Sequence, residues 1–282
     1  MDPRLKILIL SNPKGNKKRI DIISKKIRCI LDEKKILYEY LSIWPGSINN
    51  YKEVWLIGGD GTLHYFINQY PDIKLPIVIF KGGTGNDLSW KLYGEMNVEE
   101  QVQHALTATA MPVDAVRCND KLFINGIGIG FDGEVLKSMR SIRMIGGHLG
   151  YLVAVIRKIF SFKELFFRIN IDGQIFDGKY LLALVCNSSR MGGGFMVSPL
   201  SEISDGKLNF ILCKPLGIFK RLRYLPVIEK GKHLELPFIR EVSAKQISIS
   251  CNKNVPAQID GELIYSTKFE ISILPGKFLF KY

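Results

Sequence analysis

Two glycine-rich turns, each directly after a short apolar run, constrain the fold of this 282-residue chain more than any other feature. The apolar runs Val54–Ile57 and Ile77–Phe80 are typical of buried strands. The turns that follow them read Gly-Gly-Asp-Gly at 58–61 and Gly-Gly-Thr-Gly at 82–85. A helix predicted from Thr62 to about Tyr70 separates the two strands. This order of strand, helix and strand indicates a parallel sheet built from βαβ units.

The sequence pattern changes near residue 113, which predicts two domains. Before it, a strand at 6–10 and a helix at 17–35 extend the α/β pattern. After it, short strand-like segments separated by Asp-Gly and Pro-Gly turns predict a mainly antiparallel β domain. Strands are predicted at 115–117, 122–126, 165–171, 180–187, 208–213, 246–250 and 269–274, and helices at 135–160 and 218–229. We therefore expect an α/β domain at 1–113 and a β-sandwich domain at 114–282, whose extreme C-terminus is able to pack back on the first domain.

Composition and charge narrow the class of protein. A hydrophobic content of 46% is that of a globular chain, and the net charge of +12 favours phosphate-bearing partners: nucleotides, nucleic acid or an anionic membrane. No nucleic-acid motif accompanies the charge. Five scattered cysteines argue against disulfides or zinc, and no apolar run is long enough to span a bilayer. A cytoplasmic protein is expected.

The glycine turns have the chemistry of a phosphate site. In a parallel α/β sheet, ligands bind beyond the carboxyl ends of the strands, where both turns lie. Glycines let the backbone approach a phosphate, and Thr62 is placed to cap the following helix. Asp60 and Asp87 would repel phosphate unless a metal stood between them, and magnesium prefers such oxygen ligands. The alternative is that each turn is only a tight connection.

These residues also carry a family resemblance. Gly58–Thr62 and Gly83–Asp87 resemble the paired nucleotide-binding motifs of the diacylglycerol kinase catalytic domain family, which includes sphingosine kinases and small soluble bacterial lipid kinases. Further similar segments follow in the expected order, at 125–132, 186–194, 205–208, 231–233 and 258–262. The resemblance covers essentially the whole chain and favours the compact bacterial type.

The resemblance implies a function and a set of site residues. It implies an ATP-dependent lipid kinase that transfers the γ-phosphoryl group of Mg-ATP to a hydroxyl of a membrane lipid, with a nucleotide-binding first domain and a lipid-binding second domain. ATP and Mg²⁺ are the implied cofactors. The implied nucleotide-binding residues are Asn12, Lys14, Gly58, Gly59, Asp60, Gly61, Thr62, Gly83, Thr84, Gly85, Asn86 and Asp87. The motif around Lys14 is one residue shorter than the family's usual pattern.

Catalytic and metal-binding residues follow from the same resemblance. Asp260 matches the family's proposed general base, and Glu262 stands in the same motif. Asp205 matches a structural magnesium position that is supported by nearby backbone carbonyls. The implied metal set is Asp205, Asp60, Asp87, Glu202 and Lys207, with Asp60 and Asp87 connecting to metal through water. For both Asp205 and Asp260 the alternative is a simple Asp-Gly turn.

Two basic segments are candidates for contact with a membrane. In Ile218–Leu225, three cations, Lys220, Arg221 and Arg223, are interleaved with apolar residues, which predicts peripheral contact with anionic headgroups at the inner membrane face. A solvated basic helix is the alternative. In the segment 137–158, Arg140, Arg143, Arg157 and Lys158 either line a lipid entrance or belong to a helix that covers the second domain, which we favour.

Several alternatives stay open at the level of sequence. A soluble-substrate kinase of the NAD kinase type shares the first glycine motif but not those at 83–87 and 260–262. A non-catalytic lipid- or nucleotide-binding protein is expected to have lost Asp60, Asp87 or Asp260, and all three are present. The identity of the lipid, the choice of ATP over GTP, and a homodimer through the β domain are not fixed by the sequence.

Overall fold

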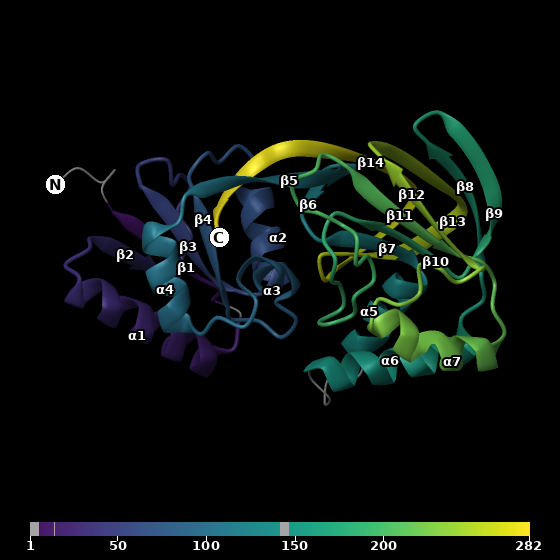
Figure 1. The fold of residues 1–282 in the computed structure, drawn as a ribbon, viewed down its shortest axis with the longest axis horizontal. Coiled ribbons are helices and arrows are strands. Elements are labelled where there is room, and N and C mark those ends of the chain that lie inside the picture. The colour runs from purple at the N-terminus through teal and green to yellow at the C-terminus, as the bar shows by residue number, and fades with distance from the viewer. Residues whose placement is uncertain (1–5, 14, 142–146) are drawn as a thin grey trace. The chain divides into compact units, whose positions relative to one another are not determined.

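The chain folds into two compact units in the computed structural model, which describes residues 6–13, 15–141 and 147–282. Unit 1 contains the residues up to Val113 together with Gly276–Tyr282, and unit 2 contains Asp114–Pro275. The chain passes between the units through two strands, β5 (Ala110–Cys118) and β14 (Glu262–Lys281) (Figure 1). The C-terminal end of β14 therefore belongs to unit 1.

Unit 1 is an α/β domain around a parallel sheet. Its strands run in the order β14–β4–β3–β1–β2, and every neighbouring pair is parallel. Strands β1, β3 and β4 are buried almost throughout, as expected for a parallel sheet that is covered on both faces. The elements are β1 (Ile7–Ser11), α1 (Lys17–Glu33), β2 (Tyr38–Leu41), β3 (Glu53–Gly58), α2 (Asp60–Gln69), β4 (Ile77–Lys81), α3 (Asp87–Tyr93) and α4 (Val98–Thr107).

Local sequence signals account for most of these elements. Helix α1 starts after Asn16, whose side chain accepts a hydrogen bond from the Arg19 N–H at 3.1 Å, and isoleucines at helical spacing form its buried face. Two elements escaped the sequence analysis. Strand β2 is half-buried at the sheet edge, and α4 begins with a capping box between Asn97 and Glu100.

The end of β14 is fixed in unit 1 by a buried ion pair. Lys281 Nζ lies 2.9 Å from Glu53 Oε2, and Glu53 Oε1 accepts from Trp55 Nε1 at 2.8 Å. The Tyr93 hydroxyl donates to the Lys281 carbonyl at 2.9 Å. The turn expected at Pro275-Gly276 was wrong, because β14 runs through it. Gly276 has a φ of +58°, which changes the backbone direction without ending the strand.

Unit 2 is built on an antiparallel sheet with strand order β12–β11–β10–β7–β13–β14. The hairpin of β8 and β9 adds to β13, and β5 pairs with β14 and β6. Phenylalanines from four strands, Phe123, Phe167, Phe210 and Phe269, meet in its main core. The strands are β6 (Lys121–Phe123), β7 (Gly126–Gly130), β8 (Leu165–Ile171), β9 (Gln174–Tyr180), β10 (Leu182–Cys186), β11 (Leu208–Cys213), β12 (Ile239–Ala244) and β13 (Gln246–Ile259).

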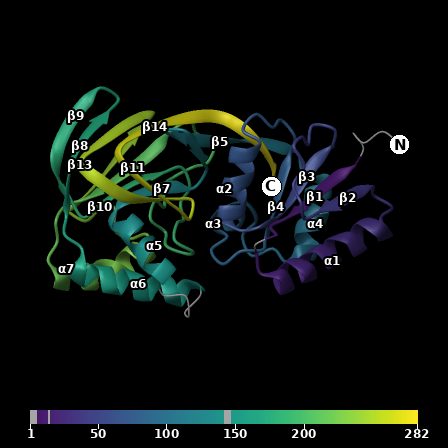
Figure 2. The same cartoon turned by 180° about the vertical axis from the view of Figure 1, so that it is seen from behind.

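In the part of unit 2 that the structure describes, three helices accompany this sheet: α5 (Phe131–Ser141), α6 (Gly147–Ser161) and α7 (Ile218–Glu229). Figures 1 and 2 show α6 and α7 side by side along one edge of unit 2. The sequence predicted one helix at 135–160, where the structure has α5 and α6. Among the described residues, no helix combines the length and apolar character needed to cross a bilayer.

Three further strand predictions need correction. The segment predicted at 122–126 is divided between β6 and β7, because the backbone N–H groups of residues 124–126 bond to a side chain instead of a strand. The segment at 180–187 is divided at Leu181, and Asp177-Gly178, predicted as a turn, lies inside β9. Strand β12 was missed because its residues alternate only weakly between buried and exposed.

We expect Lys281→Met to destabilise unit 1 by about 3–5 kcal/mol, because it leaves the Glu53 carboxylate buried without its cation. Lys277→Met is the matched control, since Lys277 pairs with a largely exposed Asp72 and its loss should cost about 0–1 kcal/mol. All three tryptophans, Trp44, Trp55 and Trp90, lie in unit 1, so urea unfolding followed by tryptophan fluorescence reports this unit. If the two substitutions lowered the free energy of unfolding equally, the Lys281–Glu53 ion pair would not be what stabilises unit 1.

Candidate active site

The two glycine turns of unit 1 pack directly against each other through their backbones. The Gly82 N–H donates to the Gly58 carbonyl at 2.8 Å. A Cβ atom on Gly83 would lie 2.5 Å from the Gly59 Cα, and a Cβ on Gly59 would lie 2.8 Å from the Gly83 Cα. Such distances exclude any side chain, so these glycines are required for the contact between the turns.

Asp60 of the first turn binds the segment after the second turn, and Asn86 braces the second turn itself. The Asp60 carboxylate accepts hydrogen bonds from the N–H groups of Asp87 at 3.1 Å and Leu88 at 3.2 Å, and thereby caps helix α3. Asn86, in the left-handed region with φ +54°, accepts from the Gly83 N–H at 2.8 Å and donates to its carbonyl at 2.9 Å. Asp60, Asn86 and Asp87 therefore lie in one connected cluster.

Thr62 does not cap α2 as the sequence predicted. The N-cap is Gly59, and α2 begins at Asp60, so Thr62 lies inside the first helical turn. Its hydroxyl oxygen instead accepts a hydrogen bond from Asn12 Nδ2 at 2.8 Å, which connects the end of β1 to this turn. The helix starts two residues early because extended backbone at Gly59 already serves as the boundary, without a capping side chain.

The remaining predicted nucleotide-binding residues differ in their placement. Thr84 is exposed at the tip of its turn, while Gly61 and Gly85 are half-buried. Lys14 lies outside the described residues. Arg19, which the sequence analysis did not select, donates from Nη1 to the Gly83 carbonyl at 2.8 Å, so a cation from α1 reaches the second glycine turn. No sequence signal separates Arg19 from the other cations of α1.

We expect Gly83→Ala to lower the stability of unit 1 by about 3 kcal/mol, because the new methyl group would overlap the Gly59 backbone. Gly46→Ala is the matched control, since a Cβ at Gly46 meets no atom within 4 Å. Its effect should stay within about 1 kcal/mol and be slightly stabilising. Tryptophan-monitored urea unfolding distinguishes the two variants, and a neutral Gly83→Ala would refute the packing argument.

In unit 2, Asp260 occupies a two-residue hairpin turn between β13 and β14. Asp260 and Gly261 have φ values of +44° and +85°, as a turn of this length requires. The Asp-Gly turn that the sequence offered as an alternative at Asp260 is therefore present. The Asp260 side chain is nonetheless buried, and its carboxylate accepts the N–H groups of Ile124, Asn125 and Gly126 at 2.8–3.0 Å. Glu262 is exposed at the start of β14.

The segment 124–126 is held from its other side by Asn187. Asn187 Nδ2 donates to the Ile124 carbonyl at 2.9 Å, and the Asn187 N–H donates to the Asn125 carbonyl at 2.9 Å. Asp260 thus binds the N–H groups of this segment and Asn187 binds its carbonyls. Asn187 Nδ2 also donates to the Asp114 carbonyl at 3.3 Å, which extends the network to β5.

The predicted metal turn connects to the same network. The Asp114 carboxylate accepts the Gly206 N–H at 2.7 Å, and Asp205 Oδ1 accepts the Lys207 N–H at 3.0 Å. Glu202, Asp205 and Lys207 are all exposed. In the described part of the chain, no group of three or more His, Cys, Asp and Glu side chains lies close enough to hold a metal. Magnesium at Asp205 would therefore depend on backbone carbonyls and water for its other ligands.

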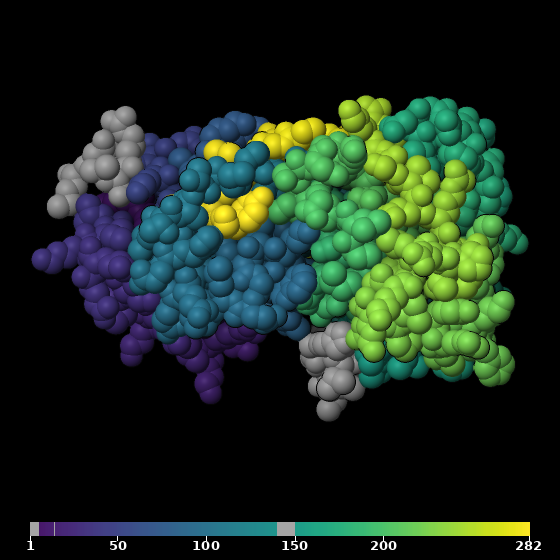
Figure 3. All heavy atoms as spheres, in the orientation of Figure 1, coloured from purple at the N-terminus to yellow at the C-terminus, as the bar shows by residue number. Residues whose placement is uncertain are grey.

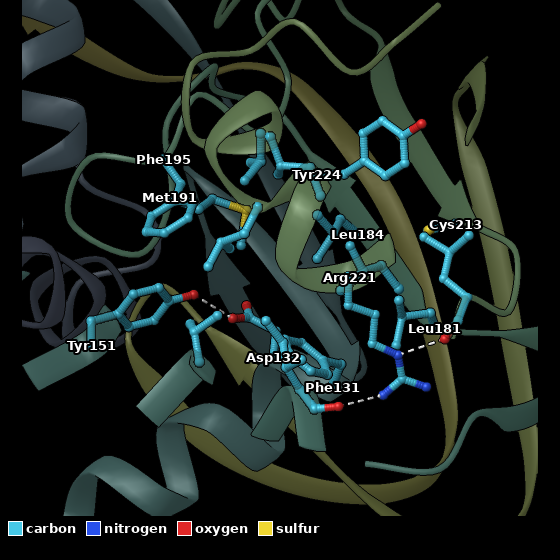
Figure 4. Close-up of a pocket in the computed structure, with 17 residues that line it drawn as sticks. Phe131, Asp132, Tyr151, Leu181, Leu184, Met191, Phe195, Cys213, Arg221 and Tyr224 are labelled. Carbon is cyan, nitrogen blue, oxygen red and sulfur yellow. Dashed lines mark hydrogen bonds between the residues drawn. The ribbon is translucent and has the colours of Figure 1, made fainter. Parts of the chain in front are cut away.

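An apolar cavity of about 80 Å³ lies within unit 2, between the sheet and the helices α6 and α7 (Figure 4). Its lining is apolar except for Asp132, Tyr151 and Tyr224, which bring oxygen atoms, and Arg221. The Tyr151 hydroxyl donates to Asp132 Oδ1 at 2.8 Å. The other lining residues are Phe131, Val155, Ile159, Leu181, Leu182, Leu184, Met191, Phe195, Val197, Cys213, Leu216, Leu225 and Ile228.

Asp132 is the one ionisable carboxyl group among the lining residues. Burial raises its pKa to about 6, against the opposing effect of the Tyr151 hydrogen bond. Gly128 makes room for this side chain, because a Cβ there would lie 2.2 Å from Asp132 Oδ2. Sequence reasoning included Asp132 only as the end of a glycine-rich segment and assigned it no role.

Arg221 does not belong to a membrane-facing set, and this part of the prediction was wrong. Its guanidinium is buried and donates to the carbonyls of Leu216, Ile159 and Phe162, and it pairs with Glu164. Lys220 and Arg223 are exposed. In the second basic segment, residues 137–158, Arg157 is exposed and Lys158 pairs with Glu134. Arg143 and the side chain of Arg140 lie outside the described residues.

We expect Asp132→Asn to change how the stability of unit 2 depends on pH. The native-state pKa of about 6 exceeds the unfolded value, so protonated Asp132 is favoured in the fold and wild-type stability falls as pH rises from about 4 to about 6. At pH 8 the variant should gain about 3 kcal/mol relative to wild type, and at pH 4 little. Urea unfolding followed by far-ultraviolet circular dichroism measures this difference, and a pH-independent difference would refute it.

Comparison with known proteins finds a matching family model for each of the two domains. Residues 6–118 match the family model of the diacylglycerol kinase catalytic domain, and residues 125–279 match that of the YegS C-terminal NAD kinase beta sandwich-like domain. A curated relative from Shewanella frigidimarina, named "probable lipid kinase YegS-like", is 28% identical over 80% of this chain and 75% of that protein.

Solved structures give the same result. The crystal structure of a "putative diacylglycerol kinase" from Bacillus anthracis superposes with a TM-score of 0.81 at 25% identity, over 99% of this chain and 97% of that one. An NAD kinase from Archaeoglobus fulgidus, solved with ATP, shares the fold with a TM-score of 0.56 at 15% identity, over 98% of this chain and 93% of that one. The chain therefore belongs to the family of lipid kinases that combine a diacylglycerol kinase catalytic domain with a YegS C-terminal domain.

Proposed function

We propose that this protein transfers the γ-phosphoryl group of Mg-ATP to a hydroxyl of a membrane lipid, such as a diacylglycerol or a sphingoid lipid, at the inner face of the cytoplasmic membrane. The observation that carries this proposal is the apolar cavity of unit 2. A soluble-substrate kinase has no use for a cavity that is lined almost entirely by hydrocarbon. A lipid hydroxyl, by contrast, is attached to acyl chains, and the cavity offers an apolar lining to part of one.

Unit 1 would bind the nucleotide. The glycines bring the backbones of the two turns together without intervening side chains, and α2 begins at Asp60, after the N-cap Gly59, without a side-chain cap. The N-terminus of α3 is capped by Asp60, so α2 is the helix better suited to receive a phosphate on its first N–H groups. Arg19 would add a positive charge beside the second turn.

Magnesium fits the residues present only as a water-rich ion. Asp60 and Asp87 are neighbours within unit 1, because the Asp60 carboxylate accepts the N–H of Asp87, and carboxylate oxygens are ligands that Mg²⁺ prefers. Asp60 and Asp87 would therefore hold the metal through water. When bound, Mg²⁺ would neutralise phosphate charge, and Asp205 would hold a separate structural ion with the carbonyls of its turn.

In unit 2, Asp260 would accept the proton of the lipid hydroxyl. The hydroxyl oxygen attacks the γ-phosphorus, the bond from that phosphorus to the β–γ bridging oxygen breaks, and ADP leaves. Three backbone N–H groups fix the orientation of the Asp260 carboxylate, which is what a positioned base needs. Asn187 positions the segment that supplies these N–H groups, and Glu262 stands two residues away on β14.

The polar groups of the cavity would bind the lipid near its polar end. The Asp132–Tyr151 pair can donate and accept hydrogen bonds inside an otherwise apolar lining. Binding of the lipid by the Asp132–Tyr151 pair is a separate step from the proton transfer assigned to Asp260. Loss of Asp132 should therefore act mainly on the Michaelis constant for the lipid.

The test is transfer of labelled phosphate from Mg-ATP to a panel of lipids in mixed micelles. Asp260→Asn should lower the rate at least about 100-fold, because it removes the proton acceptor. Asp172→Asn is a closely matched control. Asp172 also occupies an Asp-Gly hairpin turn, with φ +46°, and its carboxylate also accepts backbone N–H groups, those of Lys245 and Gln246. Its rate should match wild type.

As a control for folding, the unfolding midpoint and the nucleotide binding of each variant are measured. If Asp260→Asn is folded, binds ATP and phosphorylates lipid at the wild-type rate, Asp260 is not the base. If wild type phosphorylates soluble alcohols and no lipid, the protein is a soluble-substrate kinase. If it binds ATP and transfers phosphate to neither class, its role is binding alone.

A further inference from the structure

Helix α6 is apolar on the side that faces solvent. Val153, Ile156, Arg157 and Phe160 are all exposed, and their spacing of three and four residues places them on one face. The side chain of Phe160 is 58% exposed. The inner face of the same helix contributes Val155 and Ile159 to the cavity lining. A surface helix normally turns polar residues outward, whereas three of the five exposed residues in the described part of α6 are apolar and only Arg157 and Ser161 are polar, which calls for a partner.

Helix α7 continues this surface. Phe219 is 89% exposed, and Arg223 and Pro226 follow it at spacings of four and three residues, which forms a second outward stripe. Its inner face also lines the cavity, through Arg221, Leu225 and others. Figure 3 shows α7 (light green, lower right) at the surface of unit 2.

The two stripes are fixed to each other by Arg221. Its guanidinium donates to the Leu216 carbonyl before α7 at 2.7 Å, and to the carbonyls of Ile159 and Phe162 at the end of α6 at 3.0 and 2.9 Å. The end of α6 therefore lies against the start of α7. Phe160 and Phe219 are near these two ends, so one rigid layer carries both aromatic side chains.

The charge of this layer is positive. Within residues 150–163 and 217–230, the exposed charged side chains are all cations: Arg157, Lys163, Lys220, Arg223 and Lys230. Glu164, next to this range, is engaged by Arg221. We name the surface formed by Val153, Ile156, Phe160, Ile218, Phe219 and these five cations the α6–α7 face.

We propose that the α6–α7 face docks the protein on an anionic membrane leaflet, with Phe160 and Phe219 at the acyl boundary and the cations among the headgroups. This inference rests on the proposed function and assigns its membrane contact to one surface. Apolar residues interspersed with cations match an anionic interface. A second copy of the same face would bring like charges together, so self-association through it is disfavoured.

The cavity explains why docking would occur here. The inner faces of α6 and α7 line the cavity and their outer faces form the α6–α7 face. Only this helical layer would separate a docked membrane from the cavity. A lipid could then move between the bilayer and the cavity without exposing its acyl chains to water.

The experiment is vesicle sedimentation of the full chain without nucleotide, on phosphatidylcholine vesicles with and without about 30% phosphatidylglycerol. Wild type should bind the anionic vesicles and bind the neutral ones at least about tenfold more weakly. The double variant Phe160→Ser/Phe219→Ser should lose about tenfold or more in binding to anionic vesicles. Its matched control is Phe166→Ser, which removes an exposed phenylalanine from β8. That variant should bind as wild type does.

Charge is tested in the same assay. Lys220→Glu/Arg223→Glu should also lose about tenfold or more, while Lys245→Glu/Lys253→Glu, a reversal of two exposed cations elsewhere in unit 2, should lose much less. The proposal is overturned if variants of the α6–α7 face bind anionic vesicles as wild type does, or if their controls lose as much. It is also overturned if wild type is dimeric and the aromatic variant monomeric.

Lipid phosphorylation in detergent micelles separates this inference from the proposed function. If the protein phosphorylates micellar lipid but binds no vesicle through this face, the docking proposal fails and the kinase assignment stands. If vesicle binding depends on the α6–α7 face but no lipid is phosphorylated, the docking proposal stands and the kinase assignment fails.

Discussion

Buried backbone N–H groups without a strand or helix partner are the constraint on which this structure depends, and aspartate side chains satisfy them. Glycine-rich turns create such groups, because they interrupt regular secondary structure while remaining inside the fold. Asp60 binds two of them at the start of α3, Asp260 binds three at 124–126, and Asp114 binds the Gly206 N–H. Each contact joins segments that are far apart in the sequence. Together they hold the turns in conformations that the local sequence alone would leave undefined.

This constraint gives the motif residues a structural role beside their proposed chemical one. Asp60 caps α3 through both of its carboxylate oxygens, and a carboxylate is also the kind of ligand that Mg²⁺ prefers. Asp260 is fixed by its three donors, and the network continues through Asn187 to Asp114 and the Asp205 turn. Rigidity at these positions is consistent with catalysis by positioning, which dominates phosphoryl transfer.

The helical layer of unit 2 follows a different principle. Helices α6 and α7 are apolar toward the cavity and partly apolar toward solvent, so packing against the sheet satisfies only one of their faces. A buried arginine, Arg221, fixes the two helices together, because it donates to the Ile159 and Phe162 carbonyls at the end of α6 and to the Leu216 carbonyl before α7. The cost of burying this cation is offset by Glu164 and by those hydrogen bonds. The result is a thin layer over the cavity, whose lining also includes the carboxyl group of Asp132 at the start of α5.

The sequence by itself determined the α/β pattern of unit 1, the β-rich character of unit 2 and the family motifs, because strand alternation, glycine turns and helical spacing are local properties. It predicted β8, β11 and α7 at their observed bounds. It could not assign the N-cap of α2, the strand through Pro275-Gly276 or the burial of Arg221, since each depends on neighbours distant in the chain. Only the tertiary structure placed Arg19 on the second glycine turn, joined Asp132 to Tyr151 and enclosed the cavity. These contacts arise from packing between elements, which leaves no periodic signal in the sequence.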